Sequence, residues 1–491
     1  MDLTLLLEKK DKTQLSIVNY LMSSKHPVKQ NDLIRDLSLT KYVFQSNLEE
    51  LSNTFQKLHS NMRIEKRKIE NRIYLTLING DHGGINKLYH FLLNNSTEYQ
   101  LLLYFFKNKH RSICDISNKF NISETSIYHY LKELNLFLDT FKIKIKQGML
   151  QGDEINICYF YYHFFLASES LPTDVINDTN ENIFIDYLIE RLFLELAPDD
   201  KVKLKLWHDI IVQRKSILAK KYLNKQNLDF LKSNYFFKEI KNSYHNFYGY
   251  RDFNKYESQI MFIYFFIATI STHPSTKFKN GNLSYEELII PSIIEINNYI
   301  FSKLFNQLEI SKKESSRTII RNWIYPLTEI HTQIFFFKTI SSPTLLNFEE
   351  IYEMEVKKIT TTNLLFLDEL IEGIISNFNL SFSEKSAKVV KLVYFNMLKQ
   401  IEYLTKKTIL IVIYSYLGYL KVQLLKQKIE RIFPKNFKIN FEPATQYKNY
   451  DLLISDTYNI SNDLSFDSYY ILYDLGSETD LTNLINIIKN I

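Results

Sequence analysis

The apolar residues in the stretch Ser112–Asn135 are not spaced as in a single helix. Counted from the first of them, they follow at +4, +6, +11, +15 and +18, with a polar break at Asn121. One continuous helix would keep its period through that break. The spacing predicts a helix, a turn that buries one apolar side chain, and a second helix capped by Ser123. The apolar residues are Ile116, Phe120, Ile122, Ile127, Leu131 and Leu134.

The same pattern occurs 83 residues earlier, in Asn31–Leu51. Its apolar residues and its capping threonine align one by one with those of the later stretch: Leu33, Leu37, Leu39, Thr40, Phe44, Leu48 and Leu51. A further apolar helix is expected before each pair, at Thr13–Ser23 and at Tyr99–Lys107. The sequence therefore predicts two copies of a three-helix unit that contains a helix-turn-helix.

Alternating apolar and polar residues follow each copy and predict a β-hairpin. The two segments are MRIEKRKIENRIYLTLI (residues 62–78) and FKIKIKQGMLQGDEI (residues 141–155), the second with a turn at Gly148. A helix-turn-helix followed by a basic hairpin is the plan of a winged helix. The cationic side chains of both wings suit contacts with phosphate groups: Arg63, Lys66, Arg67, Lys68, Arg72, Lys142, Lys144 and Lys146.

The outward side chains of the second helices are candidates for contacts with base edges. They are Lys41, Tyr42, Gln45 and Ser46 in the first copy, and Thr125, Ser126, His129 and Lys132 in the second. Many protein-interaction domains also contain one three-helix unit, so one copy alone has little specificity. Two copies with wings favour double-stranded DNA as the ligand, and modules that contact other proteins are the alternative.

The distribution of charge along the chain agrees with binding of a polyanion by the first third of the chain. Residues 1–150 hold 22 Lys+Arg and 15 Asp+Glu, a net charge of +7. The other 341 residues hold 38 and 40, a net charge of −2, out of totals of 60 and 55. The excess of positive charge therefore lies with the predicted winged helices.

Composition indicates a large helical protein. Only 10 Gly and 9 Pro occur in 491 residues, so most of the chain is expected to be helical, in about three to five domains. The apolar window Met261–Ile270 is too short to cross a membrane and is expected to be a buried helix. Cys114 and Cys158 are expected as small core residues of a reduced protein. With no recognisable signal peptide, we expect a cytoplasmic protein without membrane contacts.

The second hairpin runs directly into LQGDEINICYFYYHFF (residues 150–165), and long helical segments follow. Two winged helices, this GDE junction and the aromatic helix after it resemble the Mga/AtxA family of bacterial regulators. The resemblance implies a mainly α, multidomain chain in which the helical segments are PRD modules (phosphotransferase-system regulation domains). The expected domains are residues 1–85 and 86–152 (winged helix-turn-helix), 153–278 and 283–403 (PRD modules) and 405–491.

PRD modules in this family carry histidines that accept phosphate from HPr, the phosphocarrier protein of the sugar phosphotransferase system. By position, the resemblance implies His208 and His273 in the first module and His331 in the second. The chemistry requires an exposed neutral imidazole nitrogen. For each of the three, a structural histidine is the alternative, because Trp207 and Ile210 flank His208 and Pro274 follows His273. His163, within an aromatic run, is expected in the core.

After residue 404 the period changes to alternating strands and helices, which predicts a small α/β domain with a parallel sheet. Ile409–Ile413 and Tyr469–Leu472 are expected as core strands, with a helix at Tyr419–Ile432 and a closing helix near Glu478–Ile488. This tail resembles the enzyme IIB domain of sugar phosphotransferase systems. Ser415 stands where that family has its phosphate-accepting cysteine, with Gly418 nearby, so we expect an inactive module used for dimer contacts.

The resemblance implies a transcriptional regulator that binds A/T-rich promoter DNA, forms a homodimer through the tail and the PRD modules, and responds to histidine phosphorylation by HPr. Three alternatives come from other classes: a phosphotransferase phosphocarrier, an RNA-binding antiterminator and a scaffold that does not bind DNA. No catalytic, cofactor or metal-binding residues are expected, and GDHGG (residues 80–84) is expected to be a linker.

Overall fold

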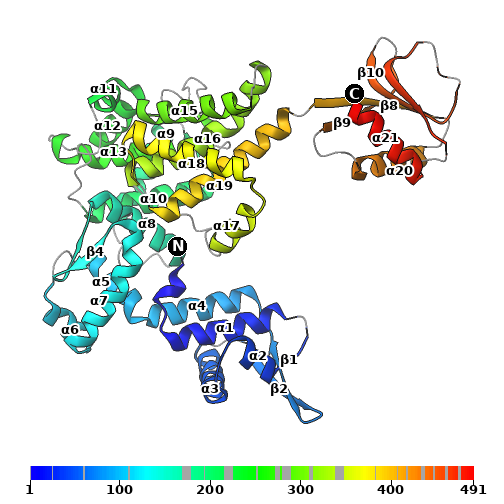
Figure 1. Cartoon of the computed structure of the whole chain (residues 1–491). Coiled ribbons are helices and arrows are strands. Elements are labelled where there is room, and N and C mark those ends of the chain that lie inside the picture. Colours follow the sequence, from blue (N-terminus) through cyan, green and yellow to red (C-terminus); the bar gives the residue numbers. More distant parts are fainter. Residues whose placement is uncertain are drawn as a thin grey trace. The chain divides into compact units, whose positions relative to one another are not determined.

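Helices dominate the part of the chain that the structure describes, as the scarcity of glycine and proline predicts. The structure is a computed structural model (Figure 1). It describes residues 2–24, 26–58, 61–108, 111–168, 179–192, 194–214, 225–249, 253–270, 277–278, 289–308, 313–337, 348–381, 383–405, 407–415, 419–432, 437–445, 448–458, 460, 463–473 and 477–490.

The chain divides into two compact units. One holds residues 1–300 and 324–392, and the other holds residues 301–323 and 393–491.

The first predicted copy contains three helices and a sheet. Its elements are η1 (Leu3–Leu6), α1 (Lys9–Ser23), β1 (Val28–Lys29), α2 (Gln30–Asp36), α3 (Lys41–Lys57), β2 (Arg63–Ile69) and β3 (Arg72–Ile78). Strand β3 lies between β1 and β2 and is antiparallel to both. The predicted hairpin is therefore present, and β1 is a third strand that the sequence pattern did not indicate.

The second copy repeats the three helices and the hairpin, which is shorter, and an additional helix precedes them; none of its described elements corresponds to β1. Its elements are α4 (His82–Asn95), α5 (Thr97–Lys107), α6 (Ile113–Phe120), α7 (Glu124–Leu138), η2 (Asp139–Phe141), β4 (Lys144–Lys146) and β5 (Met149–Gln151). The GDHGG segment is a helix start rather than a plain linker. The Asp81 side chain accepts a hydrogen bond from the Gly84 amide at 2.6 Å, and this caps α4.

The aromatic segment after the GDE junction forms α8 (Glu154–Ser168), which is buried on every side. The Tyr161 hydroxyl donates to the Leu102 carbonyl of α5 at 2.9 Å, and the Tyr159 ring stacks on Phe337 at 3.9 Å. A helix that is apolar all round needs partners on all faces. Helix α8 has them in the second copy on one side and in the helical segments on the other.

The helical segments continue as α9 (Thr179–Arg191), α10 (Pro198–Arg214), α11 (Lys225–Ser233), α12 (Tyr235–Tyr248), α13 (Phe253–Ile270), α15 (Pro291–Gln307), α16 (Lys313–Phe337), α17 (Phe348–Val356), α18 (Thr361–Phe378) and α19 (Glu384–Thr405). A short hairpin pairs β6 (Leu194–Glu195) with β7 (Lys277–Phe278). The apolar window in α13 is buried over residues 260–267, as predicted. None of the helices in the described ranges is both long enough and apolar enough to cross a membrane.

The tail forms the predicted parallel sheet. Strands β8 (Lys407–Tyr414), β9 (Phe437–Glu442), β10 (Asn449–Ser455) and β11 (Ser465–Ile471) lie in the order β11-β10-β8-β9, and every pair is parallel. Helices α20 (Tyr419–Ile432) and α21 (Glu478–Asn490) pack on one face, where Ile409 and Ile411 meet Leu425 and Leu484.

Two sequence-based expectations about single residues are wrong. Tyr469 is not a core residue, because its side chain is 59% exposed on β11, whereas Tyr470 and Leu472 pack against the core. Neighbouring residues of a strand point to opposite faces, so an uninterrupted apolar run does not place every member inside. Cys158 is buried as expected, but Cys114 is exposed on α6.

Candidate nucleic-acid interface

The two helix-turn-helix turns have the same backbone conformation. Ser38 and Asn121, 83 residues apart, both have a left-handed φ, of 52° and 53°. The next residue of each copy, Leu39 or Ile122, donates its amide to a carbonyl in the last turn of the preceding helix, at 2.8 and 3.1 Å. The offset found in the apolar pattern is therefore an offset in the backbone as well.

Hydroxyl caps begin the second helix of each copy, as predicted. The Thr40 hydroxyl accepts a hydrogen bond from the Val43 amide at 3.2 Å, and the Ser123 hydroxyl accepts one from the Ser126 amide at 3.2 Å. Each bond satisfies an amide that has no partner within the helix. These caps fix where α3 and α7 start and so which side chains lie at their N-terminal ends.

The paired apolar positions form equivalent cores. The aligned pairs Leu33/Ile116, Phe44/Ile127, Leu48/Leu131 and Leu51/Leu134 are all buried. The residues in the turns, Leu39 and Ile122, are half-buried. Because the same positions fill both cores, the remaining faces of α3 and α7 point to the same side of each copy.

The outward faces of α3 and α7 expose most of the residues predicted to meet base edges. Lys41, Tyr42, Gln45, Thr125, His129 and Lys132 are exposed, and Ser46 and Ser126 are half-buried. The Tyr42 side chain is 82% exposed. A large exposed aromatic ring at the N-terminal end of a helix is suited to contacts with bases or sugars.

One exposed residue of this face, Tyr128, was missing from the sequence-based set. Its side chain is 59% exposed on α7, next to His129. The 83-residue offset places it opposite Gln45, so the repeat itself contained the signal. Tyr128 joins the candidate residues of the second copy.

Two of the predicted base-edge residues already have partners within the chain. The Gln45 side chain donates to Glu49 at 3.0 Å, and its oxygen accepts from the Lys66 ammonium at 3.5 Å, so helix α3 and the first wing are linked. The Ser126 hydroxyl lies 2.9 Å from the Ser123 hydroxyl at the helix cap. These side chains must change partners before they can contact a base.

The first wing is a long hairpin with a two-residue turn. Glu70 and Asn71 both have positive φ, of 45° and 60°, which is the geometry of the tight turns that match strand twist. All the predicted cations of this wing are exposed: Arg63, Lys66, Arg67, Lys68 and Arg72. Within the described chain, Lys66, Lys68 and Arg72 make no ion pair.

A carboxylate on this wing forms ion pairs with two of its arginines. Glu65 lies between Arg63 and Arg67, with N–O distances of 2.8 and 3.2 Å. The hydrogen bond from Arg67 and the charges of both guanidinium groups hold the pKa of Glu65 below its usual value. The free wing therefore has a smaller net positive charge than its five cationic side chains alone would give.

We expect Glu65→Gln to strengthen binding to any DNA duplex. The change removes one negative charge and leaves two guanidinium groups available for phosphates, so affinity at about 0.15 M salt should rise several-fold and fall more steeply with added salt. Binding to a labelled duplex in a salt series measures both. Glu190→Gln, at an exposed position on α9, is the matched control for charge alone. An unchanged or weaker affinity in the Glu65 variant would show that this wing does not face DNA.

The second wing presents its lysines by strict alternation. Lys142, Lys144 and Lys146 are exposed, while Ile143 and Ile145 between them are buried. Lys142 itself precedes the strand and has a left-handed φ of 55°. Asn135 holds the wing against α7: its side-chain oxygen accepts a hydrogen bond from the Ile145 amide at 2.6 Å, and its side-chain NH2 donates to the Ile145 carbonyl at 3.1 Å. The three lysines of this wing therefore lie on one surface that is fixed relative to α7.

Comparison with known proteins bears on this region directly. The family model described as the Mga helix-turn-helix domain matches residues 83–165, which run from α4 through α8 and include the α6–α7 pair. The predicted resemblance to the Mga/AtxA-like family of regulators is confirmed over this region.

Two curated relatives are similar over longer stretches. A trans-acting regulator of Streptococcus pneumoniae serotype 4 is 22% identical over 245 residues, 46% of this chain and 46% of that protein. The capsule synthesis positive regulator AcpB of Bacillus anthracis is 22% identical over 324 residues, 58% of this chain and 63% of that protein. The matches to this Mga/AtxA-like chain thus span less than two thirds of the length of either relative.

Two of the three predicted phosphate-accepting histidines are deeply buried, and His273 lies outside the described residues. His208 in α10 is fully buried, with its ring 5.1 Å from that of Phe184. His331 in α16 is fully buried, and its Nδ1 lies 2.5 Å from the Asn297 amide oxygen. A phosphate donor can reach either imidazole only if the surrounding helices separate.

Burial also keeps these histidines uncharged. It lowers the pKa of His208 and of His331 to about 3, and it does the same to His163 in α8. His163 is in the core, as predicted, and neither of its ring nitrogens has a hydrogen-bond partner among the described residues. All three rings are therefore neutral at physiological pH.

We expect the free energy of unfolding to decrease as pH falls below about 6.5. Each folded-state pKa lies below its unfolded value, so the unfolded chain binds more protons between about pH 6.5 and 3. His163→Phe keeps an aromatic ring without a titrating group, and should reduce the slope by roughly 1 kcal/mol per pH unit. Urea unfolding at pH 7.5, 6.5 and 5.5 measures it. His26→Gln, at an exposed position, should leave the slope unchanged, and an equal slope in both variants would contradict the expectation.

The predicted site in the tail is occupied by an internal hydrogen bond. Ser415 follows β8 and donates to the Asp456 carboxylate, which follows β10, at 2.8 Å. Gly418 lies outside the described residues. A carboxylate at this position disfavours a bound phosphate by like-charge repulsion, and a serine hydroxyl is a weaker nucleophile than a cysteine thiolate.

Proposed function

We propose that the protein is a DNA-binding transcriptional regulator of the Mga/AtxA type. One observation carries the proposal: the same helix-turn-helix, with equivalent turn, cap and core positions, occurs twice, and each copy is followed by a hairpin with exposed cations. Exposed cations on a wing suit duplex phosphates, and a capped helix with an open N-terminal face suits a major groove. The names of the two relatives denote regulators, which agrees with this function.

In this proposal each copy binds one segment of duplex. The wing lysines and arginines contact phosphates, and Tyr42, Tyr128, His129 and Lys132 face the bases. Two linked copies raise the affinity of the whole chain because the second binds at a high effective concentration. The resemblance to the Mga/AtxA family further implies that the ligand is A/T-rich promoter DNA, which is recognised more through its shape than through its base sequence.

The proposed domain organisation keeps the predicted boundaries. Residues 1–85 and 86–152 are the two winged helix-turn-helix domains, residues 153–278 and 283–403 are PRD modules, and residues 405–491 are an enzyme IIB-like domain. The order of helices and the parallel sheet of the tail support this division. The Ser415–Asp456 hydrogen bond supports a tail domain without phosphotransfer activity.

The test is binding of the full chain to A/T-rich promoter fragments across a salt series. We expect the logarithm of affinity to fall linearly with the logarithm of salt concentration. A truncation that removes residues 1–151 is a poor control. It would uncover α8, where Phe106 and Leu102 now cover Tyr161. The better variant is Tyr128→Ala/Lys132→Ala, which removes two exposed side chains and leaves the core intact.

The outcomes separate the proposal from its alternatives. If binding depends on salt and the double substitution weakens it at least about ten-fold, the result supports a protein that binds DNA through α7. No binding to any duplex at low salt would instead support modules that contact other proteins. Equal binding by the wild type and the variant would mean that α7 does not face DNA.

We propose further that HPr regulates the protein by phosphorylating PRD histidines, and that the active form is a homodimer through the tail and the PRD modules. Because His208 and His331 are buried, modification would have to accompany an opening of the helices around them. A phosphate fixed there would oppose repacking, since a buried negative charge without partners is costly. In this proposal, phosphorylation changes the packing of the PRD helices and thereby the surface through which the PRD modules form the dimer.

This second proposal has its own assay. Phosphorylated HPr is incubated with the full chain and with His208→Ala, His273→Ala and His331→Ala variants, and the transferred label is counted. Loss of label in one variant identifies the acceptor. No transfer to the wild type would overturn regulation by HPr and leave the DNA-binding proposal standing. Sedimentation of the chain at several concentrations tests the dimer.

A further inference from the structure

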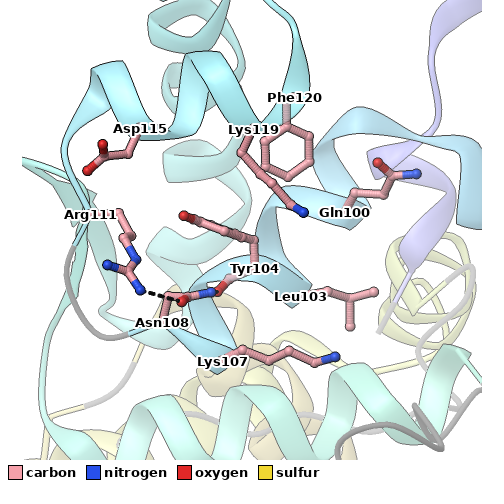
Figure 2. A pocket seen from close by; sticks show the side chains of 9 residues that line it. All are labelled: Gln100, Leu103, Tyr104, Lys107, Asn108, Arg111, Asp115, Lys119 and Phe120. Atoms are coloured by element: carbon pink, nitrogen blue, oxygen red, sulfur yellow. Dashed lines mark hydrogen bonds between the residues drawn. The ribbon is translucent and has the colours of Figure 1, made fainter.

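A pocket in the second copy, separate from the outward face of α7, has the features of an anion-binding site (Figure 2). Its volume is about 760 Å³, and it lies between α5, α6 and the connection between them. Its lining residues are Gln100, Leu103, Tyr104, Lys107, Asn108, Arg111, Asp115, Lys119 and Phe120. A space of this size holds a small organic molecule rather than one inorganic ion.

Three cations line this pocket from three directions. Lys107 comes from the end of α5, Arg111 from the connection and Lys119 from α6. Figure 2 shows Lys119 on one side of Tyr104 and Lys107 on the other. Within the described chain none of the three makes an ion pair.

The one carboxylate in the pocket is committed elsewhere. Asp115 accepts a hydrogen bond from the Ser112 amide at 3.2 Å, while its own amide donates to the Ser112 hydroxyl at 3.0 Å. This reciprocal pair caps α6. With the three cations and this carboxylate counted together, the side chains of the pocket carry a net charge of +2, which matches a phosphate monoester at neutral pH.

Arg111 is held in place before any ligand binds. Its guanidinium donates to the Asn108 side-chain oxygen at 3.3 Å, and the Asn108 amide group donates to the Tyr104 carbonyl at 2.9 Å. Its backbone amide donates to the Gly148 carbonyl at 3.1 Å. A guanidinium that is already oriented loses little entropy when it forms a bidentate pair with an oxyanion.

The rest of the lining fits the organic part of such a ligand. Tyr104 and Phe120 form an edge-to-face pair with ring centroids 5.6 Å apart, and Leu103 adds an apolar wall. Gln100 and the Tyr104 hydroxyl provide polar groups for ligand hydroxyls. A carboxylate ligand would leave part of the positive charge uncompensated, and an uncharged ligand would leave all of it.

We propose that this pocket binds a phosphate group carried on a small organic moiety. The phosphate has two possible sources: a free phosphate monoester, which carries close to two negative charges at neutral pH, or a phosphodiester of DNA that reaches α6, which carries one. The inference does not depend on DNA binding by α7. It adds a site in contact with the second wing, because the Gly148 turn rests on the backbone of Arg111. A ligand that fixes Arg111 would also steady that wing.

Calorimetric titration of the full chain tests the free source. The probes are AMP and glycerol 3-phosphate, with adenosine and glycerol as their phosphate-free counterparts. We expect at least one phosphate probe to bind and its counterpart not to. Arg111→Gln and Lys119→Gln should each weaken binding about ten-fold or more. Lys238→Gln, an exposed lysine on α12, is the matched control and should have no effect.

The same variants distinguish the second source. If neither phosphate probe binds but Arg111→Gln and Lys119→Gln each flatten the salt dependence of DNA affinity by about one unit, the phosphate belongs to DNA. If the phosphate-free probes bind as well as the phosphate probes, or if neither probe binding nor DNA affinity responds to the two substitutions, the proposal is overturned. Lys119 makes no hydrogen bond or ion pair within the described chain, so its variant should fold even if Arg111→Gln does not.

Discussion

Replacing Lys142, Lys144 and Lys146 together by glutamine should lower DNA affinity about 100-fold at roughly 0.15 M salt. Each lost phosphate contact removes about 0.9 from the salt slope, so three contacts correspond to a slope that is flatter by about 2.7. The three side chains are exposed, and the buried residues that alternate with them are unchanged. The loss should therefore come from charge and not from unfolding.

A salt series on one labelled duplex measures this effect. The control is Lys225→Gln/Lys232→Gln/Lys238→Gln, which changes net charge equally at exposed positions on α11 and α12. If both triple variants lose the same affinity, the effect is one of net charge alone and the second wing has no particular role. If only the wing variant loses affinity, the wing contacts the duplex.

Substituting alanine for Gly148 should have the largest effect on stability, a loss of about 3 kcal/mol in the free energy of unfolding. Gly148 has a φ of 71°, and a Cβ there would lie 1.6 Å from the Arg111 carbonyl oxygen. Neither atom belongs to a flexible side chain, so the backbone must move. That movement breaks the bond from the Arg111 amide to Gly148 and displaces the second wing.

Gly249→Ala separates the cost of the left-handed backbone conformation from the cost of the clash between the new Cβ and Arg111. Gly249 has nearly the same φ, 65°, but nothing lies within 4 Å of a Cβ built there. Its substitution should cost only the left-handed conformation, about 1 kcal/mol. Urea unfolding of the two variants gives the difference, which measures the close approach of the wing turn to Arg111. Equal losses would mean that the turn can move away at no cost.

Much of the fold followed from apolar spacing. The 83-residue offset located two helix-turn-helix units, and the structure places a left-handed residue, a hydroxyl cap and four buried residues at the same offset. The change of period after residue 404 located a parallel sheet with helices. Periodicity reports which side chains must leave water, and that requirement is set locally by the helix or strand.

The sequence predicted the environments of single residues less well. Tyr469 lies in an apolar run but faces water, and Cys114 lies in an apolar-periodic helix but is exposed. Tyr128, on the outward face of α7, could have been found by applying the repeat to every position. These differences arise because a run of similar residues does not say which face of an element is covered.

The sequence by itself determined the order of the main helices, the two wings and the strands of the tail, the duplication, the positive first third and the alternating lysines of the second wing, because each depends on neighbours within one element. The tertiary structure decided the rest. It buried His208 and His331, paired Glu65 with two arginines, and placed Arg111 against Gly148, 37 positions away in the sequence. Charge state and access depend on groups brought together from distant parts of the chain, and no local pattern contains that information.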